Sequence, residues 1–327
     1  LGIPASNWLQ LKTTASPATI CTTPTGPGNT STVTASFQSN SVNAAIAPAD
    51  LSVLVGLPVN WTATLGTLGA PQELTIQADG EAINTFTSNG TGGTATVIAQ
   101  VDNVPATDGL AVANIAVNTS STAPTGATGT TSVCSGGSTT LTVDGGSKGT
   151  GAITEWFTAS CGGTSAGTGD AITVSPIVTT TYYVRYSGVC NTTTCATVTV
   201  TINTNSTAPT GATGTTTICN GGSTTLTVNG GLKGTGAITQ WFTGSCGGTS
   251  AGTGDAITVS PTTTTTYYVR YSGDCNTTDC AEVTVTVNTL STAPTGATGT
   301  TTICSGGSTT LTVDGGSKGT GAITEWF

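Results

Sequence analysis

The sequence predicts an all-β protein built from tandem β-sandwiches. Three observations support this prediction: apolar and hydroxyl-bearing residues alternate in short segments, turn-forming residues separate these segments, and one block of sequence recurs along the 327 residues. Alternation places apolar side chains on one face of a strand. Thr and Val favour strands, whereas Gly, Asn and Pro favour turns. Charged residues make up only 6% of the chain, but disorder would not require such regular alternation.

The block recurs at an even spacing, because Cys219 follows Cys134 by the same interval as Cys304 follows Cys219. The string STAPTGATGTT opens each copy, first at Ser121. This period of about 85 residues is too long for a solenoid unit and suits a complete small domain. We therefore expect two full repeats, residues 121–205 and 206–290, and the first half of a truncated third repeat, residues 291–327. Because half a sandwich cannot bury its sheet face alone, we expect the natural chain to continue.

Each strand expected in the first repeat has one apolar face. In chain order the segments are TTLTV (139–143), AITEWFT (152–158), AITV (171–174), TTTYYVRY (179–186) and ATVTVTI (196–202). We expect these inward side chains: Leu141, Val143, Trp156, Ile172, Val174, Tyr182, Val184, Tyr186, Val198, Val200 and Ile202. Glu155 and Arg185 would then face each other on an outer surface.

These patterns resemble immunoglobulin-superfamily domains, because a Trp lies on the third strand and T-T-Y-Y opens the sixth, as in a tyrosine corner. A closer resemblance is to the tandem Ig-like repeats of very large secreted surface proteins of gliding and type IX-secreting bacteria. Their motifs C-S-G-G-S-T-T-L-T, W-F-x-x-S-C-G-G-T, S-P-x-x-T-T-T-Y-Y-V and C-N-T-T-x-C occur from Cys134 to Cys195. The same motifs return from Cys219 to Cys280, with Asn220 in place of one Ser. The resemblance covers residues 121–327 and implies Ig-like sandwiches arranged as beads on a string in an extracellular adhesin or stalk.

The N-terminal part is expected to hold a different sandwich. Residues 1–30 are rich in Thr and Pro and read as a linker or the end of a preceding domain. Residues 31–118 again alternate, as in STVTASF and ATVIAQV. The stretches PVNWTATLGTLG and GEAINTFTSNGTGGTATVIAQV resemble the bacterial Ig-like domains of invasin and intimin-type adhesins. This region lacks paired cysteines, so it is not a degenerate copy of the repeat.

Ten cysteines at regular spacing indicate an oxidising compartment. We expect disulfides at eight of them: Cys134, Cys161, Cys190, Cys195, Cys219, Cys246, Cys275 and Cys280. Cys190 and Cys195 flank one hairpin loop, and Cys134 and Cys161 would lie at one end of the sandwich.

We therefore expect the pairs 134–161 and 190–195, with 219–246 and 275–280 in the second repeat. The alternative is 134–190 with 161–195, and the family resemblance favours it, because simpler relatives keep one early and one late cysteine. Cys21 and Cys304 are expected to be unpaired within this segment. Cys304 would pair beyond Phe327, and Cys21 would be free, bonded to a preceding segment or intermolecular.

Several classes of chemistry are disfavoured. The chain has no His, so Ser-His-Asp and Cys-His catalysis have no base. A zinc site is disfavoured as well, because Cys190 and Cys195 are separated by four residues and no second such Cys pair occurs in the same repeat. Among the carboxylates, Asp144 and Glu155 become Asn229 and Gln240 in the second repeat, and only Asp170 persists, as Asp255. We expect no enzyme activity, no cofactor and no metal.

Charge and hydropathy also bear on partners. A net charge of −9 with six Lys and Arg argues against nucleic acid and anionic lipid. No apolar run approaches the roughly 18 residues of a spanning helix, so we expect no membrane insertion in this segment.

The sequence thus predicts an extracellular, cell-surface stalk or adhesin segment that mediates attachment or filament formation. Its partner would be an unidentified surface or glycan ligand, or other copies of itself. Two alternatives stay open: a self-assembling subunit of an extracellular filament or surface layer, and the non-catalytic stalk of a secreted hydrolase. The Thr-rich outward faces show no repeated apolar patch, which favours the stalk. Asn191 and Asn276 are the expected glycosylation sites if the source glycosylates its proteins.

Overall fold

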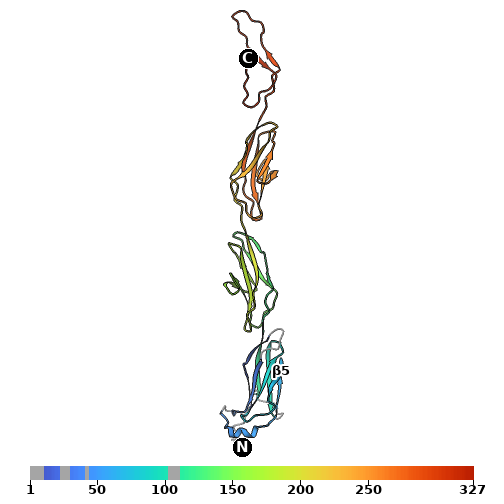
Figure 1. Cartoon of the computed structure of the whole chain (residues 1–327), viewed down its shortest axis with the longest axis vertical. Helices are drawn as coiled ribbons and strands as arrows, with labels where there is room; N and C mark the ends of the chain where they lie inside the picture. Colours follow the sequence, from blue (N-terminus) through green and yellow to red (C-terminus); the bar gives the residue numbers. More distant parts are fainter. Residues whose placement is uncertain (1–10, 23–29, 41–43, 102–110) are drawn as a thin grey trace. The chain divides into compact units, whose positions relative to one another are not determined.

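Almost all regular structure in the chain is β-strand. The structure is a computed structural model that describes residues 11–22, 30–40, 44–101 and 111–327. Within these residues the only helical segments are α1 (Pro48–Leu51) and the 3-10 turn η1 (Ser52–Leu54). Strands account for the rest of the regular structure, among them β5 (Gly66–Gln72), which is labelled in Figure 1. The all-β prediction is confirmed.

Two four-stranded sheets form the N-terminal sandwich. The first sheet has the order β1 (Lys12–Ser16), β3 (Thr30–Ser36), β6 (Glu81–Ser88), β5. The second has the order β2 (Thr19–Thr22), β8 (Val112–Thr119), β7 (Gly93–Val101), β4 (Val59–Ala63). Val33 and Phe86 of the first sheet belong to the same buried apolar cluster as Val97 and Ile115 of the second. The two sheets therefore share one core.

The prediction that residues 1–30 are a linker or the end of a preceding domain is wrong for Lys12–Ser16 and Thr19–Thr22, which form β1 and β2 of this sandwich. β2 runs parallel to β8 and places Ile20 opposite Val117, and both side chains are buried. The short segment TICT does not stand out by its alternation, and its partner strand lies far along the chain. Residues 1–10 and 23–29 of the predicted linker lie outside the described residues.

The first repeat pairs a small sheet with a large one. The small sheet has the order β14 (Ala171–Val174), β11 (Thr139–Asp144), β9 (Gly126–Thr128). The large sheet has the order β10 (Ser132–Cys134), β16 (Ala196–Asn203), β15 (Thr180–Ser187), β12 (Ile153–Thr158), β13 (Thr164–Thr168). All neighbours are antiparallel except β10 and β16, which run parallel. This parallel edge strand decides where Cys134 lies.

The expected inward residues form the core of the first repeat. Most of them are buried: Leu141, Trp156, Ile172, Val174, Tyr182, Val184, Tyr186, Val198 and Val200. Val143 and Ile202 are only half-buried. Trp156 is fully buried, and its indole Nε1 donates to Gly169 O at 2.9 Å. This single hydrogen bond satisfies the indole and fixes the GTGD loop over the core.

The second repeat reproduces the first, element for element. Its small sheet has the order β17 (Gly211–Thr213), β19 (Thr224–Asn229), β22 (Ala256–Val259). Its large sheet has the order β18 (Thr217–Cys219), β24 (Ala281–Asn288), β23 (Thr265–Ser272), β20 (Ile238–Thr243), β21 (Thr249–Thr253). Trp241 takes the place of Trp156, with the same bond to Gly254 O at 2.9 Å. Residues 291–327 contain only β25 (Gly296–Thr298) and β26 (Thr312–Asp314).

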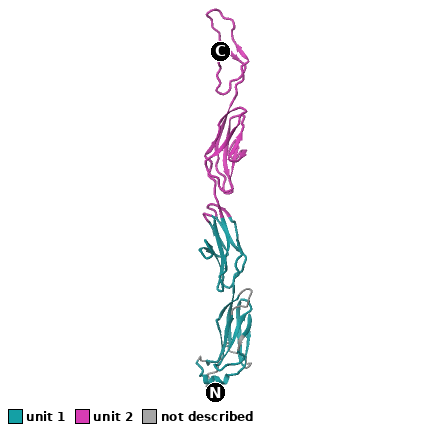
Figure 2. Cartoon of the chain, in the orientation of Figure 1, with its two compact units in different colours: residues 1–131, 138–175, 179–200 teal, residues 132–137, 176–178, 201–327 magenta. Residues whose placement is uncertain are grey.

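Two compact units divide the chain, as Figure 2 shows. One contains residues 1–131, 138–175 and 179–200, and the other contains residues 132–137, 176–178 and 201–327. The short segment with Cys134 is in the same compact unit as residues 201–327, although its strand β10 pairs within the large sheet of the first repeat.

We predict that Trp156→Ala destabilises the first repeat by about 3–5 kcal/mol, because truncation of a fully buried Trp removes apolar contacts and leaves a cavity. Hydrogen exchange read by mass spectrometry on the full chain should then quicken in peptides from β12 and β15. Peptides from β20 and β23 serve as the internal control and should keep their protection. Equal loss of protection in both repeats would contradict the independence of the two cores.

Candidate functional site at the joints between sandwiches

The carboxylates of Asp170 and Glu155 each form an ion pair with a basic side chain. Asp170 forms an ion pair with Lys148, and the Thr154 hydroxyl also donates to its carboxylate. The Lys148 ammonium and then Thr154 lower the pKa of Asp170 below its ordinary value. Lys233, Asp255 and Thr239 repeat this arrangement in the second repeat. The ion pair therefore tethers a glycine-rich loop, and Lys148 remains exposed at the surface.

Glu155 and Arg185 face each other on the large sheet, as predicted. Arg185 Nε donates to Glu155 Oε2 at 2.9 Å, and its guanidinium lies 4.7 Å from the centroid of the Phe157 ring. In the second repeat Arg270 donates to Gln240 at 3.0 Å. Because the amide replaces the carboxylate without disturbing the geometry, the acidic group itself is dispensable. No group of three or more His, Cys, Asp or Glu side chains gathers anywhere in the part of the chain that the structure describes.

What the structure does build repeatedly is a joint where one sandwich follows another. We define the first joint as residues 119–121, the second as 204–206 and the third as 289–291. At the first joint, Thr119 N donates to Thr150 Oγ1 at 2.9 Å, and Thr150 N donates back to Thr119 O at 3.0 Å. Thr119 ends β8 of the N-terminal sandwich, whereas Thr150 belongs to the first repeat. The joint is thus hydrogen-bonded on both sides.

The sequence KGTG supplies the close approach that this joint needs. Gly149 N donates to Ser121 Oγ at 2.9 Å. A Cβ on Gly149 would lie 2.2 Å from Thr119 O, far inside contact distance. Gly151 has a φ of +66°, in the left-handed region that favours glycine. The backbone path around the joint therefore requires both glycines. This structural need accounts for the KGTG motif, to which we assign no catalytic or binding role.

Asn191 of the C-N-T-T-T-C hairpin clamps the main chain of the first joint. Ser121 N donates to Asn191 Oδ1 at 2.8 Å, and Asn191 Nδ2 donates to Ser121 O at 2.9 Å. One side-chain amide thereby satisfies both backbone groups of Ser121, whose own exposed fraction is 6%. The hairpin loop is therefore part of the joint. The expected Cys190–Cys195 disulfide would have made it a turn closed on itself.

The second joint has the same contacts. Thr204 and Thr235 exchange hydrogen bonds of 3.0 Å, and Asn276 brackets Ser206 at 2.8 and 2.9 Å. At the third joint Thr289 and Thr320 pair in the same way. Because one donor and acceptor set recurs at the spacing of the repeat, the joint is an encoded feature of the sequence.

Disulfides cross the joints. Cys21 on β2 of the N-terminal sandwich bonds to Cys190 in the hairpin of the first repeat, with a Cα–Cα distance of 5.5 Å. Cys134 on β10 bonds to Cys275 in the hairpin of the second repeat, also at 5.5 Å. Cys21 and Cys134 are equivalent positions, because each lies on a short edge strand opposite an Asn near the end of the neighbouring strand, Asn118 and Asn203.

The other two disulfides stay within a repeat. Cys161 bonds to Cys195, and Cys246 bonds to Cys280, each at a Cα–Cα distance of 5.8 Å. Of the cysteines, all of which fall among the described residues, Cys219 and Cys304 are free and exposed.

The expected pairs 134–161, 190–195, 219–246 and 275–280 are therefore wrong, and of the alternative only 161–195 is correct. The physical reason is the direction of β10. Because β10 runs parallel to β16, Cys134 lies beside Asn203 at the end of that strand. Cys195 precedes its start, so about 25 Å of strand separates the two ends at ~3.3 Å per residue. Cys134 and Cys161 thus lie at opposite ends of the sandwich.

The prediction of which cysteines are unpaired is correct for one residue and wrong for two. Cys21, expected to be unpaired, is bonded, whereas Cys219, expected to be bonded, is free; Cys304 is unpaired as expected. A sequence signal for Cys21 exists: T-I-C occurs at 19–21, 217–219 and 302–304, and the first two copies lie on the edge strands β2 and β18.

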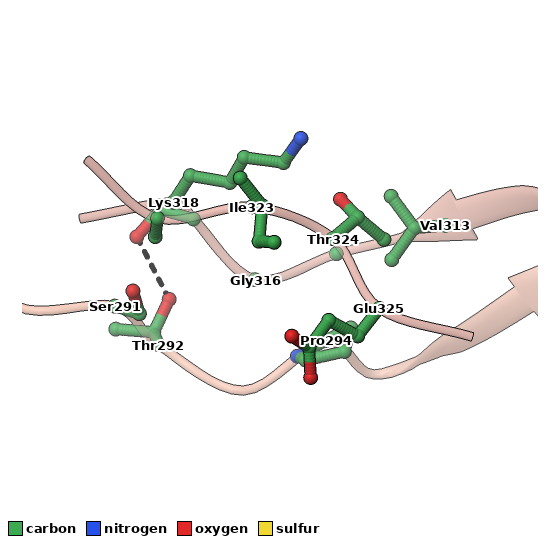
Figure 3. A pocket seen from close by; sticks show the side chains of 12 residues that line it. Ser291, Thr292, Pro294, Val313, Gly316, Lys318, Ile323, Thr324 and Glu325 are labelled. Carbon is green, nitrogen blue, oxygen red and sulfur yellow. Dashed lines mark hydrogen bonds between the residues drawn. The ribbon is translucent and has the colours of Figure 1, made fainter. Parts of the chain in front are cut away.

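A hollow in residues 291–327 is lined by Pro294, Val313 and Ile323, as Figure 3 shows. Thr292 and Ser317 hydrogen-bond at 2.8 Å along its edge. The same residue types in the first repeat, such as Pro124 and Val143, are buried or half-buried against their sandwich. Ile153, the counterpart of Ile323, is by contrast exposed. The hollow thus combines positions that a complete repeat covers with positions that it leaves open, and we assign no ligand to it.

A family model, the Ig-like domain described as CHU_C-associated, matches residues 122–203 and 207–288. These two segments make up half of the chain. The chain belongs to this Ig-like family. The match also fits the tandem Ig-like adhesin region that its motifs resemble. No curated protein sequence matches the chain.

A solved structure of tandem Ig domains shares the fold of the chain, and two adhesin structures resemble it less closely. A three-Ig fragment of titin, domains I67–I69 in an E-to-A variant, has a TM-score of 0.50 at 12% identity and covers 86% of this chain and 98% of the fragment. The Escherichia coli adhesin FdeC has a TM-score of 0.41 at 14% identity and covers 87% and 99%. The Yersinia pseudotuberculosis adhesin InvE has a TM-score of 0.29 at 20% identity and covers 59% and 58%. At these identities the likeness concerns the fold alone.

We predict that Asn191→Ala loosens the first Ig-like joint by about 1–2 kcal/mol, because both backbone groups of Ser121 lose their partner. Amide exchange at Ser121 should quicken. Asn276→Ala is the matched control and should act on Ser206 while leaving Ser121 unchanged. Unaltered exchange at Ser121 in the first variant would show that the clamp contributes nothing.

We predict that Cys219 becomes bonded when a complete third repeat follows it. A copy of residues 243–290 placed after Phe327 supplies the missing part of that repeat, including a copy of Cys275 at the same separation of 141 that joins Cys134 to Cys275. Peptide mapping without reduction should then find Cys219 linked to that copy. The same extension with Cys275→Ser in the added part should leave Cys219 open to alkylation, and labelling of Cys219 in both proteins would refute the pairing.

Proposed function

We propose that the chain is a stalk segment of an extracellular, cell-surface adhesin, a spacer that holds other parts of the molecule away from the surface. The observation that carries the proposal is the pair of disulfides that crosses successive joints, Cys21–Cys190 and Cys134–Cys275. Disulfides of this kind persist in oxidising compartments outside the cytoplasm. Covalent attachment of each sandwich to the next suits a spacer, because it keeps the sandwiches joined even where a joint loses its hydrogen bonds.

Other features support a spacer. The outward strand faces are rich in Thr, and hydroxyl pairs such as Thr140 with Thr173 and Thr181 with Thr199 link neighbouring strands there. The joint segments are held by hydrogen bonds on both sides, so they are not free linkers.

Among the residues that the structure describes, we find no helix with the length and hydrophobicity of a membrane span. Glycosylation at Asn191 and Asn276 remains a prediction; in both, the Nδ2 that would carry the glycan donates to the joint.

The proposal is tested by asking whether the purified, oxidised chain acts as a spacer and nothing else. The chain is anchored to a surface coated with a polymer brush and carries a reporter peptide at its free end. An antibody should bind this peptide, whereas the brush should hide the same peptide when it is anchored directly to the surface. Sedimentation velocity should find a monomer at all concentrations, and glycan arrays should show no binding.

Each alternative has its own outcome. Fibres that grow with concentration would support a filament or surface-layer subunit instead of a stalk. Saturable binding to a glycan would place the adhesive surface on the repeats themselves. A reporter that stays hidden at the end of the chain would overturn the spacer role directly.

A further inference from the structure

We infer that the disulfides connect into one continuous covalent route through the tandem sandwiches, which carries tension past most of the polypeptide and limits how far the stalk can be stretched. The mechanical meaning of this route rests on the proposed stalk function. The route itself follows from which cysteine bonds to which.

Each cysteine in a repeat is one step of the route. The route enters the first repeat at Cys190, which is bonded to Cys21 of the preceding sandwich. The hairpin leads on to Cys195, whose disulfide crosses to Cys161. From Cys161 the route follows the backbone back through β12 and β11 to Cys134, which is bonded to Cys275 of the second repeat.

The route is far shorter than the polypeptide. Between Cys21 and Cys275 it uses only the backbone of residues 134–161 and 190–195 and three disulfides. The Cα–Cα spans of these bridges are 5.5, 5.8 and 5.5 Å. At about 3.4 Å per extended residue, the stretched route measures about 125 Å with its bridges. The stretched polypeptide between the same two cysteines would measure about 860 Å.

The second repeat continues the same pattern. Its hairpin leads from Cys275 to Cys280, and the disulfide to Cys246 leads back along the backbone to Cys219. Cys219 therefore occupies the step at which Cys134 leaves the first repeat, and it is free and exposed. All four cysteines of a repeat thus have places on one path. This explains why two of them share a single hairpin, since one receives the route and the other passes it on.

The consequence under load is specific. Strands outside the route, such as β14 and β15, can lose their hydrogen bonds without lengthening the molecule between its ends. Only the backbone segments on the route can extend. Disulfides at the joints alone, or within repeats alone, would not produce this effect, because the route needs both kinds in alternation.

The test is single-molecule force spectroscopy on the full chain with handles at Leu1 and Phe327 and the free thiols alkylated. The oxidised chain should stretch to the length of about 104 residues plus three bridges, and the reduced chain to that of the whole polypeptide. Reduction should therefore add about 220 residues, or roughly 740 Å. The combined substitution Cys21→Ser and Cys190→Ser should lengthen the oxidised chain by about 81 residues, or roughly 260 Å once the two bridges that leave the route are counted.

A matched control comes from the disulfide that the route between these handles does not use. Cys246→Ser with Cys280→Ser should leave the stretched length of the oxidised chain unchanged, because tension leaves through Cys275 and the C-terminal backbone. Length is read in the unfolded state, so the result does not depend on how stable each variant is. Equal lengths before and after reduction, or lengthening by the control, would overturn the route. Fibre formation or glycan binding would overturn the stalk role and leave these lengths untouched.

Discussion

The constraint on which the structure depends is the meeting of a hairpin loop with the far end of the preceding sandwich. Three residues make this contact. Cys190 bonds covalently to Cys21, Asn191 clamps Ser121, and Gly149 lets the backbone pass close to Thr119. The second repeat has a disulfide and an asparagine clamp at the equivalent positions, so the joint recurs with the repeat as the core does. Segments that look like flexible linkers by composition are held on both sides.

The cores themselves are modest and rely on a few large groups. Each repeat buries one Trp fully and surrounds it with Tyr, Val, Leu and Ile side chains. The internal disulfide of each repeat joins cysteines at a sequence separation of 34, which by chain-entropy arithmetic corresponds to about 4 kcal/mol. This is a large share of the stability of so small a domain. Tyr186 adds a bond from its hydroxyl to Gly145 O at 3.0 Å, which links the two sheets.

Much of the fold could be predicted from the sequence, because its determinants are local and periodic. Alternation predicted the inward faces of β11, β12, β15 and β16. It also predicted that Glu155 faces Arg185, and the two residues are paired across β12 and β15. The disulfides could not be predicted in this way. Their partners depend on the parallel direction of β10, a very short strand with no pattern of its own, and on contact between domains whose cysteines are separated by 141 or 169 positions. Spacing within one repeat carries no information on either point.

The joint contacts have a genetic consequence. At a joint between two repeats the partners lie at fixed offsets, such as the 141 positions from Cys134 to Cys275, so an unequal crossover that inserts or deletes whole copies keeps those partners in register. An array of this kind can change its number of modules in one recombination event, without compensating substitutions. The near-identity of the copies favours such an exchange, and the joint geometry tolerates its result.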